Sequence, residues 1–184
     1  AHRIRPSASH APYHKVDKGL FTSDFSTCEP TPNQLRWSPF DLPKDNDKVD
    51  FIQGISSVCG AGSVPLRNGI GIHIYSANTS MENRSFYNSD GDMLIGIILI
   101  FFISSCLISL NKKKTNTFQT KKVPQKGKLD IHTELGRLEV PPNYICVIQR
   151  GIVFSVHLPE GPSRGYICEV YNGHFELPDL GPIG

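Results

Sequence analysis

Short runs of β-branched and aromatic residues, closed by glycine, proline, asparagine or aspartate, recur along most of this chain and limit the folds open to it. Strands separated by turn signals about every 8–12 residues are typical of all-β sandwiches and barrels. The 16 glycines and 14 prolines among 184 residues supply such turns and argue against a helical bundle. The sequence therefore predicts an all-β domain.

The predicted strands fall on both sides of one unusual tract. Before it, we expect strands in "VDFIQGI", "GIGIHIYSA" and "RSFYNS", with "CGAGS" (59–63) and "RNG" (67–69) as turns. After it, "LDIHTELGRLEV" alternates about a glycine turn, and three more strands are predicted in "ICVIQ", "GIVFSVHL" and "GYICEVY". Residues 49–184 thus make up one predicted β domain, interrupted by the tract.

Residues 1–48 differ in composition from that domain. Their closely spaced prolines exclude a long helix, so we expect an extended Pro-rich N-terminal arm that wraps over a surface. The aromatic side chains expected to anchor the arm are Phe21, Phe25, Trp37 and Phe40.

Charge and cysteine usage narrow the class of protein. The formal net charge is +2, but residues 96–122 hold five of the 19 basic residues and no acidic one. The remaining 14 basic and 17 acidic residues give no argument for a nucleic-acid partner. The five cysteines are widely spaced without a CxxC pair, so we expect buried free thiols and a cytoplasmic location.

The stretch from Met93 to Leu110 carries no charge and is followed by three lysines at 112–114. In isolation it has the outline of a membrane span with a cytoplasmic flank. A span here would have to leave a closed β domain in mid-strand and return to it, which such a domain tolerates poorly. We therefore rank a single-span membrane protein last among the alternatives and expect no membrane partner.

The candidate metal ligands are His132 and Glu134, which share one face if this segment is a strand. With His157 or His174 they would supply two histidines and one carboxylate, the ligand set of non-haem Fe(II) sites. The pattern H-x-E often arises by chance, however, and polar residues on a half-solvated strand need no metal. We therefore favour the interpretation without a metal.

Other polar motifs favour structural roles. Cys59 lies in "CGAGS", which lacks the spacing of a nucleophile elbow or a phosphate loop. His73, on an apolar strand, is expected to be a hydrogen-bonded core residue. In the loop "SMENRSFYNSDGD" an internal ion pair is favoured over a ligand site, and its charged residues are Glu82, Arg84, Asp90 and Asp92.

Several runs are too long and particular to match by chance, among them "PNQLRWSPFDLP", "NTSMENRSFYNSDGD", "KLDIHTELGRLEVPPNYICVIQRG" and "HFELPDLGPIG". Together they closely resemble the N-terminal part of the homogentisate 1,2-dioxygenase family. The resemblance implies a cupin-like (RmlC-type) jelly-roll barrel. It also implies an enzyme that cleaves the ring of homogentisate with O2 to give 4-maleylacetoacetate, in tyrosine and phenylalanine catabolism, and that assembles as a hexamer, a dimer of trimers.

The resemblance further implies an Fe(II) cofactor bound by two histidines and a glutamate, with another histidine as base. In the family these residues lie beyond position 184, so no catalytic, cofactor-binding or metal-binding residue is carried onto this chain. We expect the segment to serve structure and assembly and to be inactive alone. The alternative is a non-catalytic cupin-like binding or scaffold protein.

The family pattern runs from "SDGDMLI" directly into "VPQKG", whereas here residues 96–122 intervene. We interpret these 27 residues as a retained intron, and the alternative is a surface insertion peculiar to this protein. A splice within the Val123 codon requires GGT, a glycine codon, at 96 and permits AAA, a lysine codon, at 122. Gly96 and Lys122 meet both conditions, and 27 codons keep the reading frame.

Overall fold

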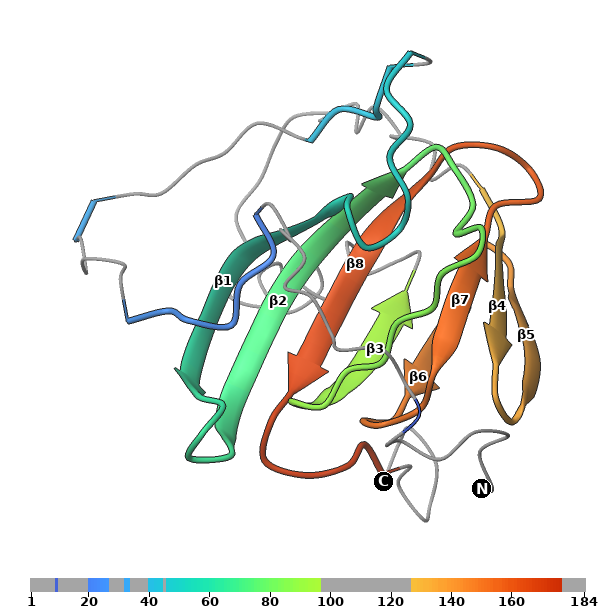
Figure 1. Cartoon of the computed structure of the whole chain (residues 1–184). Helices are drawn as coiled ribbons and strands as arrows, with labels where there is room; N and C mark the ends of the chain where they lie inside the picture. The colour runs from blue at the N-terminus through green and yellow to red at the C-terminus, as the bar shows by residue number, and fades with distance from the viewer. Residues whose placement is uncertain are drawn as a thin grey trace, which may run out of the picture.

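The fold is defined by a computed structural model that describes residues 9, 20–26, 32–33, 40–44, 46–96 and 127–176. Figure 1 shows the strands of this part of the chain, which are β1 (Ile55–Ser63), β2 (Asn68–Ala77), β3 (Asp92–Gly96), β4 (Leu129–Thr133), β5 (Gly136–Val140), β6 (Ile145–Ile148), β7 (Phe154–His157) and β8 (Ser163–Val170).

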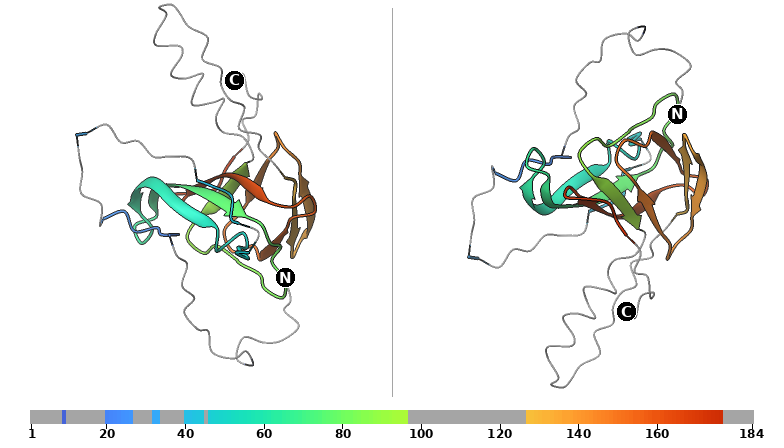
Figure 2. Two further views of the ribbon diagram at one scale, coloured as in Figure 1. Left: turned by 90° about the horizontal axis from the view of Figure 1, so that it is seen from above. Right: turned by 90° about the horizontal axis from the view of Figure 1, so that it is seen from below.

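The strands form two antiparallel sheets. Sheet A has the order β1-β2-β8-β3-β6, and sheet B has the order β5-β4-β7. Figure 2 views this arrangement from above and from below, with the orange and gold strands of sheet B at one side of sheet A. The all-β fold predicted from the sequence is confirmed for the described residues.

One hydrophobic core joins the two sheets. Ile131 and Val156 of sheet B and Ile167 of sheet A belong to the same buried cluster, and each is 0% exposed. Phe51 links the two sides, because its ring centroid lies 4.9 Å from that of Tyr75 in β2 and 6.4 Å from that of Phe154 in β7. Burying each such aliphatic side chain contributes roughly 1.5–3 kcal/mol, so the sheets stabilise one another.

The segment "CGAGS" is part of a strand, so the turn predicted there is wrong. β1 runs through it to Ser63, and the turn follows at residues 64–67, closed by a 2.9 Å hydrogen bond from Arg67 N to the Val64 carbonyl. Gly62 and Gly69 face each other across the hairpin at φ of +97° and +98°. A Cβ on Gly69 would lie 1.9 Å from a carbonyl oxygen of β1, so the glycines permit close pairing, not a reversal.

Two predicted strands are replaced by other local structure. In "VDFIQGI" the chain forms a turn, in which Gly54 N donates to the Asp50 carbonyl (2.9 Å) and the Asp50 carboxylate accepts from Gln53 N (2.9 Å). Such a side-chain bond to the backbone competes with strand pairing. In "RSFYNS" only Phe86 pairs, through an isolated bridge to Phe154. The other predicted strands are confirmed.

The arm and the tract lie largely outside the described residues. The predicted anchor Trp37, and Val123, where the interrupted strand is predicted to resume, are both outside them. In the described part of the arm, the Leu20 carbonyl accepts a 3.0 Å hydrogen bond from Ser57 N of β1, and Phe21 packs against the core. At the tract, Gly96 ends β3 between Ile145 of β6 and Tyr166 of β8. No helix within the described ranges is long and apolar enough to span a bilayer.

Candidate functional site

A buried polar chain crosses the inner face of sheet A from β1 to β8. The Ser57 hydroxyl lies 2.9 Å from His73 Nδ1, and His73 Nε2 lies 3.1 Å from a carboxylate oxygen of Glu169. His73 is 0% exposed and Glu169 is 1% exposed. Asn88 and Tyr171 also donate to the Glu169 carboxylate. A serine, a histidine and a glutamate in this order are the residue types of a hydrolytic triad, so their hydrogen bonds decide what they can do.

The serine hydroxyl is already engaged by the arm. Ser57 Oγ donates to the Thr22 carbonyl (2.8 Å) and accepts from Thr22 N (2.9 Å). Because its hydrogen is donated to the Thr22 carbonyl, Ser57 Oγ has none to pass to His73 Nδ1, so the pair is not arranged for the proton transfer that activates a nucleophile. The hydrogen bonds from Ser57 through His73 to Glu169 therefore connect the arm to the core. The prediction that His73 is a hydrogen-bonded core residue is confirmed.

Glu169 is the charged member of these hydrogen-bonded residues, and the sequence analysis did not single it out. The signal was present, because Ile167 and Glu169 alternate along "GYICEVY" and share the inner side of β8, and Tyr171 follows the strand at the same spacing. Burial together with the nearby Glu169 carboxylate raises the pKa of Tyr171, which keeps its hydroxyl protonated as a donor.

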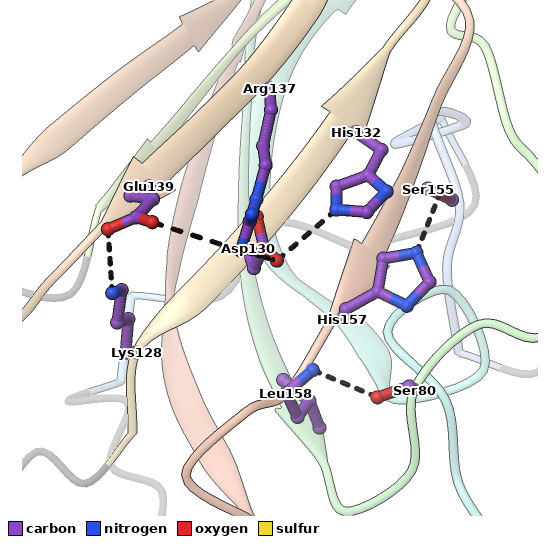
Figure 3. Close-up of polar contacts among 9 residues, drawn as sticks. All are labelled: Ser80, Lys128, Asp130, His132, Arg137, Glu139, Ser155, His157 and Leu158. Atoms are coloured by element: carbon purple, nitrogen blue, oxygen red, sulfur yellow. Dashed lines mark hydrogen bonds and ion pairs between the residues drawn. The ribbon is translucent and has the colours of Figure 1, made fainter.

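The outer face of sheet B carries a polar stripe, drawn in Figure 3 and formed by Lys128, Asp130, His132, Arg137, Glu139, Ser155 and His157. The Arg137 guanidinium donates to both oxygens of Asp130, at 2.6 and 2.7 Å. These hydrogen bonds, with a further one from His132, hold the pKa of Asp130 below its usual value. The rings of His132 and His157 lie with centroids 4.4 Å apart.

The candidate metal set does not assemble. His132 and His157 are neighbours, but Nε2 of His132 contacts Asp130 (3.2 Å) and Nε2 of His157 contacts Ser155 (3.2 Å). Glu134 accepts instead from Val153 N, at 3.3 Å. Within the ranges the structure describes, no three His, Cys, Asp or Glu residues are arranged to hold a metal ion. The iron set that the sequence analysis weighed and disfavoured is therefore not brought together by these residues.

His174, the remaining candidate ligand, has a structural contact. Its Nδ1 lies 3.1 Å from both oxygens of Asp92, which is 0% exposed and also accepts from Arg150 N (2.9 Å) and Phe175 N (3.2 Å). This carboxylate therefore fixes the chain after β6 and after β8. The internal ion pair predicted for the 80–92 loop is wrong, because Arg84 pairs with Asp50 outside the loop, at 2.7 Å.

The expectation of buried thiols is met only in part. Cys146 is buried, Cys168 is half-buried and Cys59 is exposed, and all three are free. Burial raises the pKa of the Cys146 and Cys168 thiols. Cys28, Cys106 and the lysines at 112–114 lie outside the described residues.

Comparison with known proteins identifies the family. A family model described as "Homogentisate 1,2-dioxygenase N-terminal" matches residues 1–99 and 111–184. Homogentisate 1,2-dioxygenase of Homo sapiens is 50% identical over 184 residues, which are 100% of this chain and 35% of the relative. The Drosophila melanogaster enzyme is 50% identical over 186 residues and the Arabidopsis thaliana enzyme 42% over 189, with 36% and 34% of each relative covered.

The comparison with solved structures gives matches that are more distant in sequence. A cupin-2 domain containing protein from Shewanella frigidimarina has a TM-score of 0.35 at 10% identity, covering 55% of this chain and 70% of that one. A cupin protein from Bacteroides fragilis has a TM-score of 0.37 at 11% identity, covering 61% and 75%. The sequence relatives decide the assignment: this chain, which spans about a third of their length, belongs to the homogentisate 1,2-dioxygenase N-terminal family.

Proposed function

We propose that this chain is the N-terminal part of an enzyme that cleaves the aromatic ring of homogentisate with O2 to give 4-maleylacetoacetate. The observation that carries the proposal is 50% identity to homogentisate 1,2-dioxygenase over the whole chain. The reaction belongs to tyrosine and phenylalanine catabolism. The full-length protein works in the cytoplasm as a hexamer, a dimer of trimers.

The segment itself serves structure and assembly, and Fe(II) is held by the part of the protein beyond residue 184. Two observations support this division of labour. The histidines of the polar stripe are engaged by Asp130 and Ser155, and His174 is engaged by Asp92. The buried Ser57–His73–Glu169 chain is committed to fixing the arm on sheet A.

Residues 96–122 are absent from the working enzyme. The family match supports an insertion at this place, because it leaves residues 100–110, in the middle of the tract, unmatched. β3 supports it as well: Gly96 takes an ordinary paired position between β6 and β8, and a valine there would suit a strand better than glycine. Splicing would put Val123 at that place.

Ring cleavage by the full-length protein tests the function. The full-length protein without residues 96–122, purified and supplied with Fe(II), should consume O2 in proportion to added homogentisate and form a product that absorbs as maleylacetoacetate. The segment 1–184 is the matched control and should do neither. A folded, iron-loaded full-length protein that leaves homogentisate intact would favour the cupin-like binding or scaffold protein instead.

The transcript tests the tract. Sequencing the message across codons 95–123 should give the Ile95 codon followed directly by a valine codon. A mature message that retains the 27 codons would contradict the proposal.

A further inference from the structure

One row of the outer face of sheet A is apolar across the full width of the sheet. The strand register places one outward side chain from each strand in a single row, which consists of Cys59, Ile72, Cys168, Leu94 and Val147. Four strand spacings make this row roughly 19 Å wide. The adjoining rows add Ile70, Val170, Tyr166 and Ile145. We call these nine residues the apolar face.

The apolar face breaks the pattern of a sheet with water on one side. Such a sheet alternates apolar and polar residues, whereas strands with both sides covered are apolar on both. Along β8, Ile167 points to the core, while Tyr166 and Cys168 point away from it and are half-buried. Four members of the face are exposed in this chain: Cys59, Ile145 at 58%, Ile70 at 42% and Val147 at 40%. A contiguous apolar surface of this kind marks an interaction site.

A groove of about 770 Å³ extends the apolar face toward sheet B. Leu94, Ile145 and Val147 line it from the face, and Leu135 and Leu138 line it from the β4–β5 hairpin. Phe175 and Glu176 also line the groove, so the backbone passes it after leaving β8. The groove and the face therefore form one continuous surface.

We propose that the apolar face is an internal interface, covered by apolar side chains from the part of the same polypeptide that follows residue 184. The inference rests on the proposed function, because it requires a longer protein of this family. The relatives supply that length, since this chain covers 35% of the human enzyme and matches a family described as N-terminal. Phe175 and Glu176, which stand at the end of the described residues, lie against the groove.

The chemistry of the face favours a permanent cover over a transient partner. None of its nine side chains is charged, and the charged groups lie at its margin: Asp92, the partner of Val170, is paired with His174, and Arg137 and Glu176 line the groove. Interfaces that form once and stay closed resemble a domain core cut in half. We therefore expect the covering layer to carry aliphatic and aromatic side chains opposite Leu94 and Cys168.

Site-specific photo-cross-linking in the full-length protein tests the proposal. A benzophenone amino acid replaces Val147, and Ile145 is the second position if the first variant does not fold. The expected main product is a cross-link to a residue beyond 184. Leu66, which is 74% exposed in the β1–β2 turn and lies off the face, is the matched control and should not give that product.

Mixing 14N- and 15N-labelled protein before irradiation tells the possible occupants apart. Cross-links within one isotope label and to residues beyond 184 support the proposal. Mixed-label cross-links would show a second copy on the face, and cross-links to residues 1–48 or 97–122 would show the arm or the tract. Either result, or a folded variant without cross-links, overturns it. A protein that cleaves homogentisate yet lacks the expected cross-link refutes this inference and leaves the proposed function intact.

Discussion

The outer faces of the two sheets differ although their inner faces form one core. Sheet B turns the polar stripe outward, where Arg137 and Asp130 form a two-bond ion pair on the strand surface. Sheet A turns outward the apolar face, with Ile145 and Val147 widely exposed. A sheet face exposed to water usually carries charged side chains, whereas a face covered by protein usually carries apolar ones. On the proposal made above, sheet B faces water and sheet A is covered by the rest of the polypeptide.

The inner faces should behave alike, and the expected effect on stability is large. Ile131→Ala in sheet B and Ile167→Ala in sheet A each remove a side chain that is 0% exposed in the shared core. Each should lower the free energy of unfolding of the full-length protein by about 2–5 kcal/mol, since a cavity forms as well. Denaturant unfolding of the two variants measures this, and a large loss in only one of them would contradict a shared core.

The same charge on the two outer faces should have different effects. Leu94→Glu places a carboxylate in the middle of the apolar face, where a covering layer would leave it buried and unpaired at a cost of about 3–5 kcal/mol. Ser155→Glu on sheet B should change stability by only about 0.5 kcal/mol, as at most surface positions. Thermal unfolding of both full-length variants gives the comparison, and equal shifts would erase the distinction between the faces.

The smallest effect concerns the ion pair on sheet B. Because the hydrogen bonds from Arg137 hold the pKa of Asp130 below 3.8, the folded protein binds this proton less tightly than the unfolded chain. The pair therefore stabilises the fold above pH 3.8, and that contribution is lost as the pH falls through the lowered pKa. Asp130→Asn should cost less than about 1 kcal/mol at neutral pH. The difference from wild type should shrink toward low pH, and a constant difference would contradict this assignment.

Much of the strand pattern could be predicted from the sequence. The features that could not be predicted depend on which segments lie side by side in the fold. The alternation in "LDIHTELGRLEV" predicts the β4–β5 hairpin, because one strand period and one glycine suffice to specify it. "CGAGS" was misassigned because glycine serves close strand pairing as well as turns, and only the partner Gly69 tells the two apart. The neighbours His132 and His157 come from strands more than 20 residues apart, and no local pattern specifies that contact.

The reactivity of the Cys59 thiol in the native full-length protein tests the central claim most directly. Cys59 belongs to the apolar face and is exposed in this chain, whereas Cys146 is buried in the core and serves as the internal control. If the rest of the polypeptide covers sheet A, a maleimide reagent should label Cys59 as slowly as Cys146 until denaturant is added, as read by peptide mass spectrometry. Rapid labelling of Cys59 in the native full-length protein, with Cys146 still protected, would show that the apolar face is open to water and would contradict the account.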